Sequence, residues 1–214
     1  MDRRRAGRTA AAGSVTIALA LALLIAGCAP VGKATGAPSP TDPTGHVPPM
    51  SSMTLSAPWA AASEETSPSA SELPRECGAI TVPGGKNHSP ALSWTGSPPA
   101  GTASYALAMV DMTPPGRGVV HWLVLDIPVA TSSIATAASG TEKMPRRSAE
   151  LRSETGGYGY AGPAPPAGTH TYLFVLYAMP SATSGLGRSA AIDRFFETVS
   201  RALGARTLAA TYTK

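Results

Sequence analysis

The sequence has very few cysteines: Cys28 and Cys77 are the only two among 214 residues. Two cysteines cannot form the disulfide framework of a small secreted domain, and they are too few for a thiolate zinc cluster. Charged residues make up only 14% of the chain, and aromatic residues only 6%. The sequence contains no basic stripe with interleaved aromatic side chains, so we expect no nucleic-acid partner.

Two motifs of enzymes and cofactor-binding proteins are missing or fail in context. The chain has no Gly-x-Ser-x-Gly nucleophile elbow, so its histidines have no obvious hydrolase triad to join. The stretch "GYGYAG" (157–162) matches a dinucleotide-binding fingerprint, but a proline-rich run begins at Pro163. A helix that presents its N-terminus to a pyrophosphate cannot start there. We therefore expect no cofactor.

The N-terminus has the order of an export signal. A basic segment, "MDRRRAGRTA" (1–10), precedes an uncharged apolar stretch that runs to Gly27. This stretch ends in Ile25-Ala26-Gly27-Cys28, which resembles the lipobox, where a peptidase cuts before a cysteine that receives a diacylglyceride. We predict a lipoprotein signal peptide over residues 1–27 and lipidation of Cys28. The protein would then be exported and held by its acyl chains on the extracytoplasmic face of the bacterial cell membrane.

Removal of this signal changes the charge of the protein. Residues 1–27 contain four arginines and one aspartate, so the net charge falls from +4 to +1 without them. The basic pI therefore belongs largely to the signal. Whether export uses the general or the twin-arginine route stays open.

A segment rich in Pro, Ser, Thr and Gly follows the lipobox. Residues 29–52 contain few aliphatic side chains, which cannot bury enough apolar surface to offset the entropy of ordering. We expect lipidated Cys28 and a flexible tether over residues 28–52, followed by one domain over residues 53–214.

The domain is predicted to be mostly β. Runs of β-branched, aromatic and aliphatic residues are separated by Pro/Gly clusters that stop strands. We expect a short first strand near 53–58, and then strands over 91–96, 104–111, 119–127, 170–179 and 207–213. Near the end, "SAAIDRFFETVSRALGA" (189–205) has apolar residues at helical spacing, with Ser189 as a candidate cap and Gly204 as a candidate terminator.

One strand carries a histidine among core residues. In "VVHWLVLDIP" (119–128), the alternation of strand side chains predicts that His121 shares a buried face with Leu123, Leu125 and Ile127. A buried imidazole must be hydrogen-bonded or must bind something. Asp111 closes one predicted strand, and His170 opens another that also carries Tyr172. Together with the glycine-rich stretch 157–168, they predict a donor-rich pocket suited to a small anion.

Four ordered blocks carry a family resemblance. They are "KNHSPALSW" (86–94), the Asp-x-x-x-Pro of "DMTPP" (111–115), His121-Trp122, and "GYAGPAPPAGTHTY" (159–172). In order and spacing, these blocks resemble the phosphatidylethanolamine-binding proteins, and more closely their bacterial Raf-kinase-inhibitor-like branch. The resemblance runs from about Met53 to the C-terminus.

The resemblance implies a β-sandwich with a C-terminal helix and few short helices. It also implies a small pocket for a phosphate or carboxylate anion, formed by Asp111, His121, the Gly162-Pro163 backbone, His170 and Tyr172. The ligand class would be a small anion or a phospholipid headgroup, held by a non-enzymatic protein. Two positions depart from the family pattern, because Thr113 replaces a second carboxylate and Ala164 stands where bacterial relatives often have cysteine.

Two other functions stay open. Two histidines and one aspartate also describe a facial metal triad, so a metal-dependent enzyme is one alternative. An inhibitor of an extracytoplasmic protease or kinase is the other, although nothing in the sequence names a protein partner. We expect no metal at the site, because the Gly/Pro loop supplies backbone donors, which suit an anion.

Overall fold

The computed structural model describes residues 36–60, 70–155 and 157–214. Contacts within the chain separate Met1–Gly32 from a second unit, Lys33–Lys214, and all described residues belong to the second unit. The predicted signal peptide over residues 1–27 and the predicted lipidation site Cys28 lie outside the described residues. None of the helices in the described ranges is long and apolar enough to cross a membrane.

The larger of two sheets has six strands in the order β2-β9-β8-β4-β5-β7. Neighbouring strands in this sheet pair antiparallel, except that β2 pairs parallel with β9. Its strands are β2 (Ser71–Glu72), β4 (Ser104–Asp111), β5 (Val119–Pro128), β7 (Ala149–Glu150), β8 (Thr169–Met179) and β9 (Gly204–Thr213). The strand predicted over 104–111 is β4, and the strand predicted over 119–127 is β5 with one more residue.

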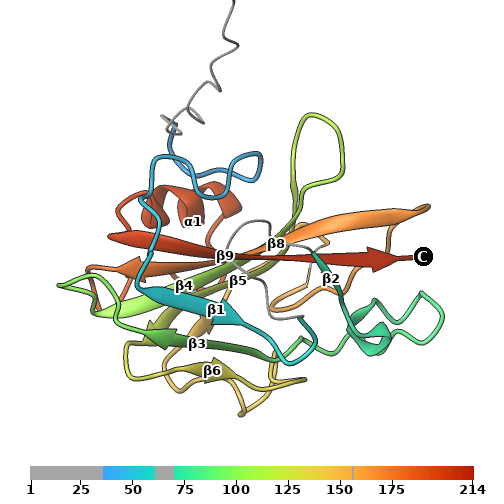
Figure 1. Ribbon diagram of the computed structural model, residues 1–214, viewed down its shortest axis with the longest axis horizontal. Helices are drawn as coiled ribbons and strands as arrows, with labels where there is room; N and C mark the ends of the chain where they lie inside the picture. Colours follow the sequence, from blue (N-terminus) through green and yellow to red (C-terminus); the bar gives the residue numbers. More distant parts are fainter. Residues whose placement is uncertain (1–35, 61–69, 156) are drawn as a thin grey trace, which may run out of the picture. The chain divides into compact units, whose positions relative to one another are not determined.

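The smaller sheet has the order β1-β3-β6 and is antiparallel. It consists of β1 (Met53–Ser56), β3 (Leu92–Gly96) and β6 (Ser133–Ile134). The helix α1 (Ile192–Val199) lies on the other side of the larger sheet, so the domain has three layers (Figure 1). A short 3-10 helix, η1 (Arg75–Cys77), follows β2. The predicted fold class, mostly β with a C-terminal helix and few short helices, is confirmed.

Each face of the larger sheet has its own core. One core lies between the two sheets and contains Trp94, Trp122 and Phe174. The other lies between the larger sheet and α1 and contains Phe195 and Val199. Strands β4 and β8 are covered on both faces, which explains why they read as continuous apolar runs rather than as alternating ones.

The predicted common face of His121 and the following leucines is wrong. Two β-bulges interrupt the pairing of β4 with β5, and each shifts the alternation by one residue. Leu123 and Leu125 face the α1 side, whereas Trp122 and Ile127 belong to the core between the sheets. His121 contacts Tyr172, which also belongs to the core between the sheets. A bulge therefore turns His121 away from the face that simple alternation assigns to it.

The predicted helix is shorter than its apolar pattern. α1 spans Ile192–Val199, with Ala191 at the N-cap and Ser200 at the C-cap. No side chain caps its N-terminus, so the predicted cap by Ser189 is wrong, and Gly204 begins β9 instead of ending the helix.

The described part of the predicted tether packs onto the domain. Residues 36–52, here called the strap, place Val47 in the core beneath α1 and Met50 in the core between the sheets. The Tyr177 hydroxyl donates to the carbonyl oxygen of Pro43 at 2.5 Å. The prediction of a flexible tether up to residue 52, with the domain starting at residue 53, is wrong for these residues.

Backbone hydrogen bonds join the strap to the first residues of β9. The Met50 amide donates to the Ala205 carbonyl, and the Ala205 amide donates to the Pro48 carbonyl, each over 2.8 Å. Proline has no amide hydrogen, but its carbonyl still accepts, so a proline-rich segment can pair with a strand in this way. A count of aliphatic residues does not reveal these carbonyl contacts or the burial of Pro38 and Pro43.

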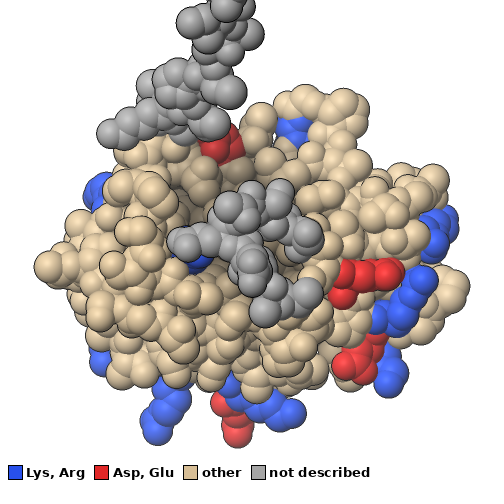
Figure 2. All heavy atoms as spheres, viewed as in Figure 1, with Lys and Arg blue, Asp and Glu red and all other residues tan. Residues whose placement is uncertain are grey.

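Charged side chains on the face seen in Figure 2 are interspersed in sign. Lys and Arg lie next to Asp and Glu along the right-hand and lower edges of this view. Lys86 and Glu76 form a pair of opposite charge, with Nζ and Oε2 4.0 Å apart.

Candidate functional site

The register of β4 and β8 brings three of the predicted site residues together. Asp111 is the last residue of β4 and pairs with Tyr172 on β8. His170 lies two residues before Tyr172 and therefore projects from the same face of the strand. The Nδ1 atom of His170 lies 2.6 Å from Oδ2 of Asp111, and the two side chains are 13% and 6% exposed.

The second oxygen of Asp111 organises the chain that leaves β4. Its Oδ1 accepts a hydrogen bond from the Thr113 amide at 2.9 Å. The Thr113 hydroxyl in turn accepts from the Thr171 amide at 2.7 Å. Thr113, which stands where the family resemblance leads one to expect a carboxylate, thus ties the end of β4 to the start of β8. This departure supports the position of Asp111 and His170.

His121 is fixed by the loop that follows β7. Its Nδ1 lies 2.8 Å from the Ala161 carbonyl oxygen, and the Ala161 amide donates to the His121 carbonyl over 2.9 Å. Because a carbonyl only accepts, Nδ1 carries the proton, and Nε2 of the neutral ring keeps a lone pair. The ring meets Tyr172 edge-on, with centroids 5.3 Å apart. The structure therefore gathers Asp111, His121, His170 and Tyr172 as the sequence predicts.

Burial keeps His121 neutral. Desolvation lowers the pKa of its imidazole below the ordinary value, and the hydrogen bond to Ala161 and the charge of Asp111 offset part of this effect. A protonated His170 would lower the pKa of His121 further. At neutral pH, His121 therefore presents an acceptor rather than a donor at Nε2.

Tyr172 supplies a buried hydroxyl to the same cluster. Its ring stacks on His170 with centroids 6.5 Å apart. Burial raises the pKa of Tyr172 far above its ordinary value, and the nearby Asp111 raises it further, so the phenol stays protonated. The hydroxyl oxygen makes no hydrogen bond of standard length and angle within the described residues. The side chain of Asp111 interacts with this hydroxyl, which is a protonated donor within the site.

Gly162 and Pro163 do not supply the free backbone donors that we predicted. The Gly162 amide donates to Oδ1 of Asn87 at 2.6 Å, and Pro163 has no amide hydrogen. The Pro163 carbonyl accepts from the Ala79 amide at 2.9 Å. A Cβ atom at Gly162 would lie 2.5 Å from the Ala79 nitrogen, so only glycine fits. These two residues seat residues 157–168, here called the Gly-Pro loop, against the segment after η1.

Asn87 is a residue that sequence reasoning missed. Its side chain accepts from Gly162 and donates to the Tyr160 carbonyl over 3.3 Å. Its own backbone has φ 56°, a left-handed conformation that asparagine tolerates better than most residues. A signal was available, because Asn87 lies in the "KNHSPALSW" block. Its partners, however, are 73 and 75 residues away in the sequence. The other predicted departure, Ala164, is exposed in the same loop.

The metal-triad alternative loses its carboxylate ligand to internal contacts. Asp111 uses one oxygen on His170 and the other on Thr113, so it orients an imidazole rather than pointing to a shared centre. Across residues 36–60, 70–155 and 157–214, no three His, Cys, Asp or Glu side chains are grouped closely enough to hold a metal ion. Cys77 is buried, and burial raises the pKa of its thiol to about 12.

Comparison with known proteins matches this arrangement to one family. The model of the phosphatidylethanolamine-binding protein family matches residues 63–213, most of the chain. The chain belongs to the phosphatidylethanolamine-binding protein family. All four side chains of the site lie within the matched range, as do Asn87 and the Gly-Pro loop.

Curated relatives come from bacteria and archaea. A UPF0098 protein of Methanothermobacter thermautotrophicus is 36% identical over 95 residues, 44% of this chain and 62% of the relative. YbhB of Escherichia coli, a UPF0098 protein, is 39% identical over 98 residues, 44% of this chain and 61% of the relative. The putative lipoprotein LppC of Mycobacterium tuberculosis is 42% identical over 100 residues, 46% of each chain. The matches thus span about half to three fifths of the relatives' own length.

A solved structure confirms the fold of this family member. The crystal structure of Escherichia coli YbcL, described as a new member of the mammalian family, superposes with a TM-score of 0.67. The match covers 77% of this chain and 99% of YbcL, at 22% sequence identity. At that identity the likeness shows the shared β-sandwich, and the function must be argued from the residues of the site.

Proposed function

We propose that this protein is a membrane-anchored, non-enzymatic binding protein that holds a small phosphate or carboxylate anion at His121, His170 and Tyr172. The observation that carries the proposal is the Asp111–His170 contact of 2.6 Å beside the buried hydroxyl of Tyr172. Asp111 would balance a positive charge on His170, whose Nε2 could then donate to an anion. Tyr172 would add a second donor.

The neutral state of His121 limits the kinds of anion that fit the site. Its Nε2 has no partner among the described residues, and in the neutral ring this atom accepts a hydrogen bond. A phosphate monoester that keeps one proton offers both oxygen acceptors for His170 and Tyr172 and a P–OH donor for His121. The second pKa of such a phosphate is about 6, so this form is populated at and below neutral pH.

The chemistry of the site supports binding rather than catalysis. Tyr172 remains a protonated phenol because burial raises its pKa, and the Cys77 thiol is equally unreactive with a pKa of about 12. Asp111 is committed to His170 and Thr113. Among the described site residues, no nucleophile is paired with a base that would activate it.

The membrane anchor rests on the sequence and on one relative. The basic N-terminus, the apolar stretch and the lipobox-like Ile25–Cys28 occur in the order that lipoproteins have. LppC, which is 42% identical over the matched 100 residues, is named a putative lipoprotein. Acylation at Cys28 would hold the domain at the extracytoplasmic face of the membrane.

The test is calorimetric titration of the full chain in detergent with phosphoethanolamine and, separately, with inorganic phosphate. We expect saturable binding that strengthens as the pH falls through the histidine range, because charge-assisted hydrogen bonds exceed neutral ones in strength. His121→Ala combined with His170→Ala should weaken binding at least tenfold, whereas His88→Ala, in a loop outside the site, should not change it. Equal affinity of the double variant and the wild type would refute the site.

A further inference from the structure

A hollow lies near the end of strand β4 that is opposite to the anion site. It has a volume of about 230 Å³ and is lined by residues from the start of β4, the end of β5, the end of β8 and the turn after it, and the last turn of α1 with the segment that follows. Ser104, which lines it, and Asp111, which belongs to the anion site, are the two ends of β4. An eight-residue strand places them roughly 23 Å apart. The hollow is therefore a separate place on the molecule.

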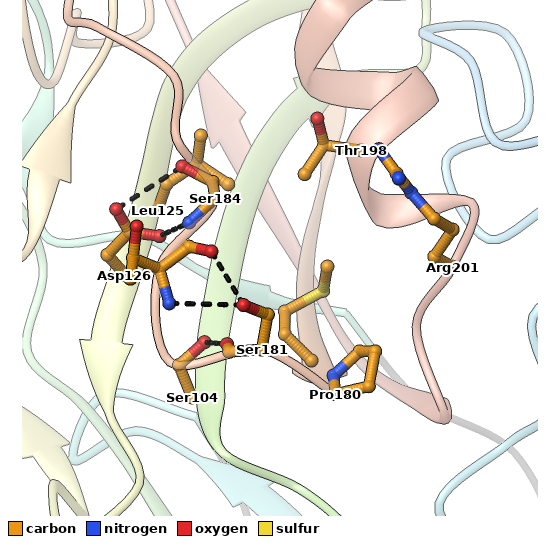
Figure 3. Close-up of a pocket in the computed structure, with 10 residues that line it drawn as sticks. Ser104, Leu125, Asp126, Pro180, Ser181, Ser184, Thr198 and Arg201 are labelled. Atoms are coloured by element: carbon orange, nitrogen blue, oxygen red, sulfur yellow. Dashed lines mark hydrogen bonds between the residues drawn. The ribbon is translucent and has the colours of Figure 1, made fainter.

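Two opposite charges border this hollow without pairing. Figure 3 shows Asp126 and Ser184 on one side and Thr198 and Arg201 on the other. In the part of the chain that the structure describes, Arg201 makes no ion pair and its guanidinium makes no hydrogen bond, and Asp126 has no cationic partner. A charge at a partly enclosed surface gains from a partner of opposite sign. Asp126 and Arg201 can therefore each form an ion pair with a bound molecule.

The carboxylate of Asp126 is held in place by the surrounding chain. Its Oδ1 accepts from the Ser184 amide at 2.6 Å, and its Oδ2 accepts from the Ser184 hydroxyl at 3.2 Å. Asp126 itself has φ 58° at a bulge of β5, a conformation that costs energy for a residue other than glycine. Strained residues of this kind concentrate at ligand sites. A carboxylate accepts about four hydrogen bonds, so Asp126 can still receive a donor from a ligand.

The floor of the hollow between the two charges is apolar. Leu125, Met179 and Pro180 line it, and the first two are almost fully buried. A volume of 230 Å³ equals about eight waters at the density of the liquid, which fits a molecule of on the order of ten non-hydrogen atoms. This is smaller than the usual pocket for a drug-sized ligand.

We propose that this hollow binds a small zwitterion of the amino-acid type, with its carboxylate on Arg201, its ammonium on Asp126 and a short apolar side chain on Leu125 and Met179. Arg201 presents a planar fork that matches a carboxylate. A ligand with both charges completes both unpaired groups at once, whereas a simple anion would leave Asp126 without a cation. The proposal is independent of the anion site, and failure of either one leaves the other standing.

The test is calorimetric titration of the full chain in detergent with three probes that share a skeleton. L-leucine carries both charges, isocaproate lacks the ammonium, and isoamylamine lacks the carboxylate. We expect L-leucine to bind at least tenfold more tightly than either of the others. Arg201→Gln should weaken L-leucine binding at least tenfold, whereas Arg146→Gln, at an exposed arginine that does not line the hollow, should not change it.

A second variant separates the two ends of the ligand. Asp126→Asn keeps a residue that tolerates the left-handed backbone and should weaken L-leucine binding about tenfold while leaving isocaproate binding unchanged. Circular dichroism of each variant checks that it folds. The proposal is overturned if no probe binds saturably, if isocaproate binds as tightly as L-leucine, or if Arg201→Gln keeps the wild-type affinity for L-leucine.

Discussion

Two segments rich in proline and glycine, the strap (36–52) and the Gly-Pro loop (157–168), are held to the sandwich by different means. The strap is held mainly by burial of Val47 and Met50 and by backbone pairing with β9. The Gly-Pro loop is held by polar atoms, among them the amide of Gly162 on Asn87 and the amide of Tyr160 on the Ser139 hydroxyl. Burial is spread over many atoms, whereas each polar contact depends on one geometry.

The two segments are expected to play different roles in stability and in anion binding. The strap contacts β9, Tyr177 and the cores, but within the described residues it makes no hydrogen bond to any of the four site side chains. The Gly-Pro loop contributes the Ala161 carbonyl that fixes the ring of His121. Changes in the strap should therefore alter the free energy of unfolding alone, and changes in the loop should alter both that energy and the affinity for an anion.

The largest expected effect comes from removal of the strap. A chain that starts at Ser51 exposes the apolar surface that Val47 and Met50 cover, which should reduce the free energy of unfolding by about 3–6 kcal/mol. A chain that starts at Gly36 keeps the strap and serves as the control. Urea denaturation of both chains measures the difference. Equal midpoints would show that the strap adds nothing to stability. Weaker anion binding by the chain that starts at Ser51 would show that the strap also supports the site.

The next effect comes from a single methyl group in the loop. In Gly162→Ala the new Cβ would collide with the backbone of Cys77 and Ala79, and forced overpacking costs roughly 1–3 kcal/mol or more. Displacement of the loop should also loosen His121, so the affinity for phosphoethanolamine should fall several-fold. Gly157→Ala is the matched control, because a Cβ there meets nothing within 4 Å. If both alanine variants behave alike in denaturation and titration, the loop is not seated as described.

One hydrogen bond from each segment gives a finer comparison. Tyr177→Phe removes the hydroxyl that reaches Pro43 of the strap and should cost about 1 kcal/mol of stability without changing anion affinity. Asn87→Ala leaves the buried Gly162 amide without an acceptor, which should cost about 1–3 kcal/mol and weaken anion binding. Thermal melts and titrations of both variants provide the numbers. Loss of affinity in Tyr177→Phe, or its preservation in Asn87→Ala, would contradict the assignment of roles.

The strand core was largely predictable from local pattern, and the departures have identifiable physical causes. β4 and β5 appear where apolar runs end at Pro/Gly clusters, because both faces of these strands are buried. The face of His121 was not predictable, since a bulge depends on the register with β4, which no local pattern encodes. The same holds for Gly162, whose amide is taken by a side chain 75 residues away. Long-range partners decide such positions.

The smallest expected effect on stability is its dependence on pH through His121. Because burial lowers the pKa of His121 in the folded state, the unfolded chain binds more protons as the pH falls below about 6.5. The stability that the folded state has while His121 is neutral should therefore be fully present above about pH 6.5. It should decline as the pH falls toward the pKa of His121 in the folded state. Urea denaturation at several pH values should show that the free energy of unfolding depends less steeply on pH in His121→Gln than in the wild type. His88→Gln should keep the wild-type slope; the reverse pattern would contradict the burial of His121.

Nuclear magnetic resonance of the imidazole nitrogens during titration with phosphoethanolamine tests whether the two histidines form an anion site. The chain has four histidines, so His46 in the strap and His88 in a loop are internal controls. We predict saturable shifts at Nε2 of His121 and His170, a retained proton at Nδ1 of His121, and unchanged signals from His46 and His88. Signals of His121 and His170 that stay unchanged at saturating ligand, or equal shifts in all four rings, would contradict it.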